Sequence, residues 1–181
     1  MKSPNLQNLI ISVLLSIIIL LPSKSFSANI DKDSLINSAN AERANRNIST
    51  LSENELLDSA ALQKAQNMFA NNYFDHYSPT GVSPWDFILA NGYDYTFAGE
   101  NLAMDFATSS GVQKAWMASP THAKNILNPD FDEIGIAVVE GTINNNQTTL
   151  VVQMFGSKTD PDVLGIFDSK LIQTINQFLG I

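Results

Sequence analysis

Glu133-Ile134-Gly135-Ile136-Ala137-Val138 is the stretch that decides the class of fold, because its large apolar side chains recur at every second residue. A second run with the same spacing, Leu150-Val151-Val152-Gln153-Met154, follows it after the polar segment 141–146. Two alternating runs joined by a loop rich in Gly and Asn predict an antiparallel hairpin. Residues 98–104 are apolar enough to predict one further short strand.

Upstream of this hairpin, the apolar residues follow helical spacing instead. The spacing predicts a helix over about residues 32–45, with one face formed by Leu35, Ile36, Ala39 and Arg43. A second helix is expected to end near residues 71–72. This helix begins after the segment 52–55. We interpret that segment as a capping box, in which Ser52 and Glu55 satisfy each other's free amides.

The next segments predict two more helices. Ser83 is the expected N-cap of a short helix, with Pro84 at its first and Asp86 at its third position, and Asn91-Gly92 ends it. Another helix starts at Ser110 with Gln113. At 119–120 it either kinks or gives way to a new turn, and 128–129 ends it. Helices outside a small antiparallel sheet predict an α+β fold, arranged as an α-β-α sandwich with a small antiparallel central sheet.

The two ends of the chain differ from this central domain. Residues 9–21 are almost wholly aliphatic, follow Lys2 and stop at Pro22, and small residues stand near position 27. We interpret 1–27 as a signal peptide, with an uncleaved N-terminal membrane anchor as the alternative. The folded domain then covers 28–157, and either interpretation makes it secreted or extracytoplasmic, in the cell envelope. Residues 158–181 form a C-terminal amphipathic extension that either packs on the domain or serves a partner.

Composition excludes some partners and stabilising devices. Without residues 1–27 the chain keeps 8 basic and 18 acidic residues, a net charge of −10. Such a surface repels phosphate backbones, so nucleic acid is not an expected partner. The chain has no cysteine. Disulfides and an N-terminal lipid on cysteine are therefore excluded, and the core alone must hold the domain together.

The chain has two histidines, and imidazole is the side chain most readily used for metal ligation or proton transfer near neutral pH. His76 follows a predicted helix end, where capping is an equal alternative to a site role. His122 is expected at the third position of a helix, whose dipole favours neutral imidazole, although a capping or core role is again open. Glu100 lies in an apolar stretch, which favours a paired or metal-facing carboxylate. Asp86 is explained as well by helix capping as by a site.

Local catalytic motifs are missing from the sequence. Neither H-E-x-x-H nor a G-x-S-x-G elbow occurs, which counts against a standard zinc protease and an α/β-hydrolase.

Five segments, taken in order, resemble the bacterial, SCP-like extracellular branch of the CAP superfamily, which joins cysteine-rich secretory proteins, antigen 5 and plant pathogenesis-related 1 proteins. The resemblance covers about residues 33–157. The segments that carry it are Asn40-Ala41-Glu42-Arg43, Asn71-Asn72-Tyr73-Phe74-Asp75-His76-Tyr77-Ser78-Pro79, Ser83-Pro84-Trp85-Asp86, Ala98-Gly99-Glu100-Asn101-Leu102-Ala103 and Trp116-Met117-Ala118-Ser119-Pro120-Thr121-His122-Ala123-Lys124-Asn125-Ile126-Leu127.

The resemblance implies an α-β-α sandwich whose central cleft gathers two histidines and two acids. His76 and His122 match the histidine pair, and Glu100 matches the acid of the Gly-Glu-Asn segment. The remaining acid falls at Asp86, where many eukaryotic members have the longer glutamate. Gln153 resembles a residue of the last core strand, where polar groups line the cleft. The disulfides, the His-Phe/Tyr-Thr-Gln signature and the hinge extensions of eukaryotic members are absent here.

Three functions remain open from the sequence. The first is a secreted binding module whose metal site uses His76, Glu100, His122 and Asp86, with zinc as the expected divalent ion and no organic cofactor. Its extracellular ligand is unknown; the resemblance adds lipid or sterol as a ligand class. The second is a metal-assisted or acid–base hydrolase, protease-like, that uses the same cleft. The third is an envelope-attached interaction protein, which contacts the membrane only if residues 1–27 are uncleaved.

Overall fold

A four-stranded sheet forms the centre of the domain in the computed structural model, which describes residues 28–158, 171 and 174–179. The strand order is β1-β3-β4-β2. The long strands β3 (Glu133–Ile143) and β4 (Asn146–Lys158) are antiparallel neighbours, and β2 (Tyr95–Met104) pairs with β4 in the same sense. The two-residue strand β1 (Ser52–Glu53) joins β3 in parallel. The predicted strand at 98–104 is therefore confirmed, and it begins three residues earlier.

The predicted hairpin is confirmed, but its loop is shorter than the sequence suggested. Strand pairing continues to Ile143 opposite Asn146. The turn consists of Asn144 and Asn145, whose φ angles are 51° and 64°. Asn tolerates this left-handed region, and two such residues match the tight turn that the twist of a hairpin favours. The expectation of a loop over 141–146 was wrong, because the two asparagines make the reversal by themselves.

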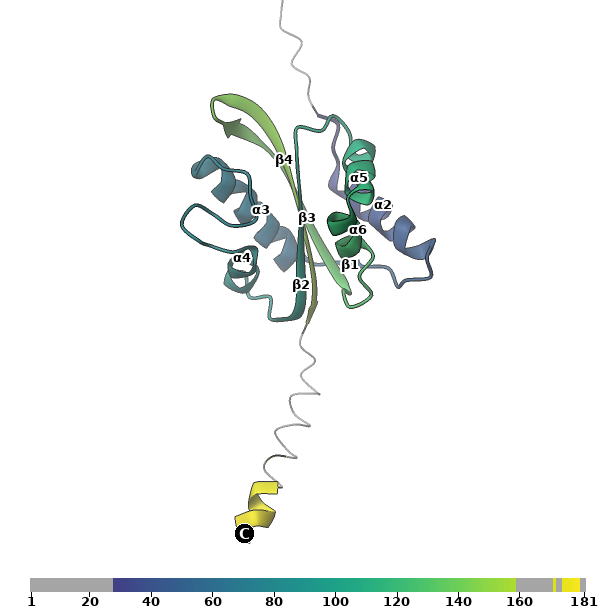
Figure 1. Ribbon diagram of the computed structural model, residues 1–181, viewed down its shortest axis with the longest axis vertical. Coiled ribbons are helices and arrows are strands. Elements are labelled where there is room, and N and C mark those ends of the chain that lie inside the picture. Colours follow the sequence, from purple (N-terminus) through teal and green to yellow (C-terminus); the bar gives the residue numbers. More distant parts are fainter. Residues whose placement is uncertain (1–27, 159–170, 172–173, 180–181) are drawn as a thin grey trace, which may run out of the picture.

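Helices cover both faces of the sheet (Figure 1), which confirms the predicted α-β-α sandwich. One layer contains α2 (Lys32–Ala44), α5 (Ser109–Ala118) and α6 (Pro120–Ile126). The other contains α3 (Glu55–Ala70) and α4 (Pro84–Ala90). Each layer has its own apolar core against the sheet, one around Trp116 and Phe155 and the other around Met68 and Leu150. Burial of these side chains is the main force that holds the layers together.

Two predicted helix starts were wrong, and strand pairing explains the first. The backbone of Ser52 pairs with Asp132, so Ser52 cannot serve as a helix cap. Asn54 is the N-cap instead, and its side-chain oxygen accepts a hydrogen bond from the Leu56 amide at 2.9 Å. Helix α5 begins at Ser109 rather than Ser110, because the side chain of Thr108 caps it.

The predicted start of the third helix is confirmed. Ser83 caps α4 through the amide of Asp86, and the Asp86 carboxylate accepts a hydrogen bond from the Ser83 amide at 2.7 Å. At 119–120 a new helix begins rather than a kink, with Ser119 as N-cap and Pro120 at the first position. This helix ends at Ile126, two residues before the predicted stop.

Only part of the two ends of the chain lies within the described residues. The predicted signal peptide or anchor at 1–27 lies outside the described residues. Among the residues that the structure does describe, no helix is both long and apolar enough to span a bilayer. Residues 174–179 are helical, with Ile175, Phe178 and Leu179 exposed. Whether this extension packs on the domain or serves a partner stays a prediction.

Candidate functional site

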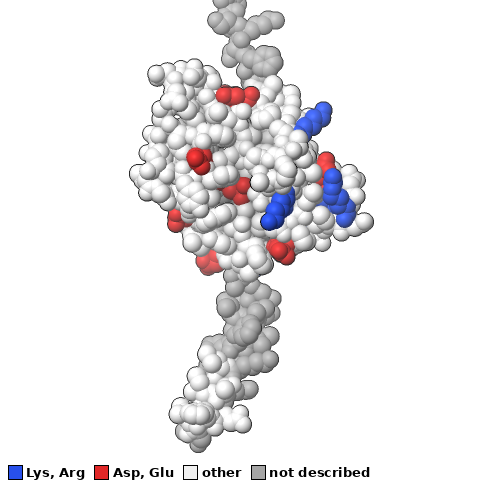
Figure 2. All heavy atoms as spheres, in the orientation of Figure 1, with Lys and Arg blue, Asp and Glu red and all other residues white. Residues whose placement is uncertain are grey.

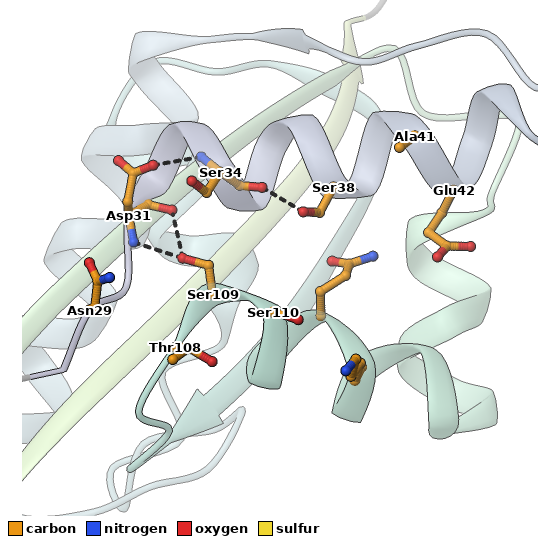
Figure 3. Close-up of a pocket in the computed structure, with 11 residues that line it drawn as sticks. Asn29, Asp31, Ser34, Ser38, Ala41, Glu42, Thr108, Ser109 and Ser110 are labelled. Carbon is orange, nitrogen blue, oxygen red and sulfur yellow. Dashed lines mark hydrogen bonds between the residues drawn. The ribbon is translucent and has the colours of Figure 1, made fainter.

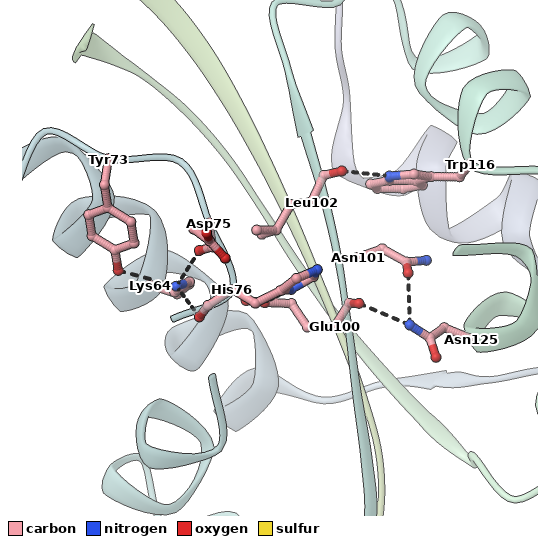
Figure 4. Close-up of polar contacts among 9 residues, drawn as sticks. All are labelled: Lys64, Tyr73, Asp75, His76, Glu100, Asn101, Leu102, Trp116 and Asn125. Carbon is pink, nitrogen blue, oxygen red and sulfur yellow. Dashed lines mark hydrogen bonds and ion pairs between the residues drawn. The ribbon is translucent and has the colours of Figure 1, made fainter. Parts of the chain in front are cut away.

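Three of the four predicted site residues lie on or beside the edge strand β2: Glu100 belongs to the strand, His76 contacts it, and the helix that carries His122 is bonded to it. Successive side chains of a strand point to opposite faces of a sheet. Leu102 accordingly belongs to the core beneath α3 and α4, whereas Ala103 belongs to the core beneath α2, α5 and α6. By the same alternation, Glu100 points toward the α3 layer and Asn101 toward α6, as Figure 4 shows. Strand β2 therefore offers a carboxylate to one layer and an amide to the other.

Glu100 binds His76, which lies in the segment between α3 and α4. The Nδ1 atom of His76 is 2.6 Å from Oε1 of Glu100. Glu100 is 3% exposed, and its Oε2 atom has no hydrogen-bond partner among the described residues. Because a carboxylate accepts hydrogen bonds, the proton of this contact belongs on Nδ1 of the imidazole. Nε2 of a neutral His76 is then free to accept a proton or bind an ion.

Burial and pairing shift the pKa values of the two partners in the same direction. Burial raises the pKa of Glu100, and the hydrogen bond from His76 opposes that rise. The hydrogen bond to Glu100 raises the pKa of His76, although partial burial opposes it. The pair therefore holds a proton more readily than either group would in water.

His122 lies at the third position of α6, as predicted. Burial lowers the pKa of His122, and the nearby charge of His76 lowers it further. Neutral imidazole was the prediction from the helix dipole, and the direction agrees, with burial as the first cause. One imidazole of the pair thus favours the protonated form, and the other favours the neutral form.

A chain of side-chain amides joins β2 to α6. The Asn101 side chain donates to the His122 carbonyl at 3.2 Å and to Oε1 of Gln153 at 2.9 Å. Asn125 donates to the Glu100 carbonyl and to Oδ1 of Asn101, both at 2.9 Å. These bonds fix the helix that carries His122 against the strand that carries Glu100. Gln153, predicted to belong to a strand whose polar groups line the cleft, is fully buried and bonds to Asn101 instead of lining the cavity.

A cavity of about 360 Å³ opens at this edge of the sheet. Its wall combines polar and aromatic side chains from both layers; it is formed by His76, Tyr77, Pro84, Trp85, Ala98, Gly99, Glu100 and Asn125. Acidic side chains are spread over the visible face of the molecule, while the basic ones lie toward the α2 and α5 side (Figure 2). The cavity is therefore small and partly aromatic, and Glu100 is the acid in its wall.

Asp86 does not join these residues in the structure. Its carboxylate is exposed and accepts hydrogen bonds from the amide and hydroxyl of Ser83, each at 2.7 Å. These bonds lower the pKa of Asp86. Within residues 28–158, no three His, Asp or Glu side chains surround a point that an ion could occupy. The four-residue metal set thus stays a prediction, of which the structure brings His76 and Glu100 into contact.

Lys64 contacts the segment that carries His76, and sequence reasoning missed it. It is fully buried on α3, among Ala60, Ala61 and Met68 of the apolar face. A lysine at an apolar position of a helix is the signal that would have found it, because charged groups are almost never fully buried unless paired. Its ammonium bonds to the backbone at His76, as Figure 4 shows.

A larger hollow, of about 540 Å³, lies between α2 and α5 (Figure 3). Its polar groups mostly secure helix starts. Asp31 caps α2 through the amide of Ser34, and Ser109 accepts a hydrogen bond from the Asp31 amide at 2.9 Å. Ser38 donates to the Ser34 carbonyl. This hollow is separate from the histidine site. Several of its polar side chains are used within the fold, whereas the buried side-chain amide of Gln113 has no hydrogen-bond partner among the described residues.

The fold and the site together define the class of protein: two helical layers enclose a small sheet, and a histidine–acid site lies at the edge strand. The model of the cysteine-rich secretory protein (CAP) family matches residues 36–155. The chain belongs to this family, as the sequence resemblance predicted.

Comparison with known proteins supports the bacterial branch. The chain is 48% identical over 101 residues to the uncharacterized protein YkwD of Bacillus subtilis, a match that covers 56% of this chain and 39% of that protein. It is 27% identical over 104 residues to the uncharacterized membrane protein YlbC of the same organism, covering 58% of this chain and 30% of that protein. The chain thus spans well under half the length of these two relatives.

Solved structures share the fold. An extracellular protein containing an SCP domain from Bacillus anthracis superposes with a TM-score of 0.61 at 26% identity, over 70% of this chain and 40% of that one. An outer surface protein from Borrelia burgdorferi gives a TM-score of 0.60 at 24% identity, over 69% of this chain and 90% of that one. The second likeness, at that identity, shows the fold alone.

Proposed function

We propose that this chain is an extracellular CAP-domain module that binds a divalent metal ion, with zinc as the expected ion, at the edge of β2. The observation that carries the proposal is the contact between Nδ1 of His76 and the buried Glu100 carboxylate. A histidine that ligates a metal usually donates its other ring N–H to a carboxylate, which fixes the tautomer and makes the ligating nitrogen more basic.

The donor set fits an ion held by imidazole. His76 offers Nε2, and His122 offers a neutral ring on the other side of the edge strand. Two imidazoles suit zinc, and water can fill its remaining positions. In this arrangement Glu100 orients His76 rather than binding the ion with both oxygens. Its unpaired Oε2 is the atom that a small shift of His76 would make available as a further ligand.

Calorimetric titration of the purified protein with zinc tests this proposal. We expect binding at one site, with a loss of at least about tenfold in affinity for His76→Ala and for His122→Ala. Glu100→Gln is expected to weaken binding by about 10- to 100-fold, the usual effect of removing an orienting partner. Glu140→Gln is the matched control, because Glu140 is an exposed acid on β3. Absence of binding, or equal binding by all four variants, contradicts the proposal.

The same contact supports a second candidate function, an acid–base hydrolase. A histidine oriented by a buried carboxylate is the arrangement that general-base catalysis uses, and water in the cavity would be the nucleophile. This function predicts turnover of peptide or ester substrates that Glu100→Gln abolishes and Glu140→Gln preserves. Turnover that survives Glu100→Gln in a folded protein, or that never appears, removes this candidate.

The extracellular location is part of the proposal. The Bacillus anthracis relative is described as extracellular, and the aliphatic run at 9–21 suits export. The N-terminal sequence of the protein recovered from its natural host tests this. A start near residue 28 supports cleavage and secretion, whereas a start at Met1 supports the anchor instead.

A further inference from the structure

Lys64 is a buried cation to which no carboxylate is bonded among the described residues. Its side chain is fully buried on α3, and its ammonium donates to the carbonyls of Asp75 and His76 at 2.8 and 2.6 Å. The third contact is the hydroxyl of Tyr73 at 3.2 Å. An ammonium has three N–H donors, so these acceptors use all of them. The amine is therefore held as a fixed charge and is not free to act as a nucleophile.

The segment that carries His76 has few other backbone anchors. Tyr73 is held by its amide, which donates to the Met68 carbonyl, and Ser78 is held by its amide, which donates to the Val82 carbonyl. Between these two points, in the part of the chain that the structure describes, Lys64 supplies the hydrogen bonds to the backbone of residues 74–77. The backbone at His76 is thus bonded to the domain through one ammonium.

The position of Lys64 relative to Glu100 reinforces this role. Burial lowers the pKa of Lys64, and the charge of Glu100 opposes that fall. Burial raises the pKa of Glu100, and the hydrogen bond from His76 and the charge of Lys64 oppose that rise. The aromatic rings of Tyr73 and Phe87 lie 4.9 and 5.8 Å from the ammonium and provide further favourable contacts. Lys64 can therefore hold the His76 backbone and favour the carboxylate that His76 contacts.

We infer that Lys64 is a positioning residue of the histidine site, whose buried ammonium fixes the backbone of Asp75 and His76 and thereby directs the His76 imidazole at Glu100. The consequence for metal affinity rests on the proposed function. The consequence for the His76 ring does not, because the contact with Glu100 is a feature of the protein without metal.

Nitrogen-15 NMR of the two imidazoles in metal-free protein at fixed pH tests the inference. The chain has two histidines, so His76→Ala and His122→Ala assign both spectra. In wild type we expect His76 to show a ring held in the Nδ1-protonated, hydrogen-bonded form. In Lys64→Met we expect its signals to move to those of a free, averaging imidazole, while the His122 signals stay in place. Lys114→Met is the matched control, because it removes an exposed lysine of α5 and should change neither ring.

Zinc titration of the same variants adds a second readout. Lys64→Met should lose at least about tenfold in affinity, as expected for the loss of a residue behind a ligand. An unchanged His76 spectrum in Lys64→Met overturns the inference. If both imidazole spectra change together, Lys64→Arg decides: restoration of the His76 signals by this charged donor supports positioning, and failure to restore them overturns it. If wild type binds no zinc, the proposed function fails, and the imidazole spectra still decide the role of Lys64.

Discussion

The two segments that carry the histidines are each held by a buried cation from a helix of their own layer. Lys64 of α3 holds residues 75–76, and Arg43 of α2 holds the chain that follows α6. Both side chains are fully buried, and both bind backbone carbonyls rather than carboxylates. A buried cation is costly unless its donors are satisfied, so each fixes the carbonyls around it in place.

Arg43 and Lys64 differ in how many segments of the chain they bind. Arg43 donates to the carbonyls of Ser49, Ile126, Asn128 and Phe131, at distances from 2.6 to 3.0 Å. Its planar fork can bind several carbonyls in fixed directions, whereas an ammonium is a compact point of charge. Arg43 therefore joins separate parts of the fold, and Lys64 holds one short segment. We infer from this difference that contacts between several parts of the domain hold the segment near His122, whereas the contacts of Lys64 alone hold the backbone at His76.

The largest expected effect comes from breaking the Arg43 anchor. Arg43→Met removes the donor of four carbonyls, several of them buried, and should lower the free energy of unfolding by about 3 kcal/mol or more. Chemical denaturation followed by circular dichroism measures this loss. The control is Arg46→Met, which removes an exposed ion pair with Glu42 and should cost less than about 0.5 kcal/mol. Equal losses in the two variants would contradict the anchoring role of Arg43.

A smaller effect is expected from cutting the amide chain between the two sides. Asn101→Ala removes the donor to Gln153 and to the His122 carbonyl, and it removes the acceptor of Asn125. Leaving the buried Gln153 without its partner should lower the free energy of unfolding by about 2 kcal/mol. The NMR signals of His122 should move, while those of His76 should not, since Glu100 still holds that ring. A change in the NMR signals of both rings would mean that the segments that carry His76 and His122 are not anchored separately.

The sequence was sufficient for the sandwich because periodicity reports which side chains are buried. A resemblance to ordered family segments also named His76, Glu100 and His122 as candidates, of which the structure brings His76 and Glu100 into contact. Sequence reasoning missed Lys64 and the chain through Asn125, because spacing along the chain does not say which carbonyls will converge in space. The wrong helix start at 52–55 has the same origin: β1 forms by pairing with β3, which is distant in the sequence, and local signals do not contain that pairing.

The next prediction compares the two acids, Glu100 and Asp86. Ser83→Ala removes the cap of α4 and should lower the free energy of unfolding by about 1 kcal/mol. It also frees the Asp86 carboxylate from its hydroxyl partner. If Asp86 serves the helix cap, as its bonds indicate, zinc affinity should not change in Ser83→Ala or in Asp86→Asn. A loss of about tenfold in Asp86→Asn alone would instead place Asp86 in the metal site.

The smallest effect concerns how stability depends on pH. The raised pKa of His76 means that the folded state binds this proton more tightly than the unfolded state. That contribution is complete below the unfolded pKa of about 6.5 and is lost as pH rises through the higher folded value. His122 has a lowered pKa, so its contribution has the opposite sign and stability is regained as pH rises toward about 6.5.

Each histidine variant should therefore expose the effect of the other ring. In His122→Ala, the gain in unfolding free energy that wild type shows as pH rises toward about 6.5 should be lost, because the ring with the lowered pKa is gone. In His76→Ala the fall above about pH 6.5 should be shallower than in wild type, since the group with the raised pKa has been removed. Denaturant titrations at closely spaced pH values measure both slopes. If the unfolding free energy depends on pH in the same way in both variants, the pKa values of the two imidazoles are not shifted in opposite directions, and the prediction is wrong.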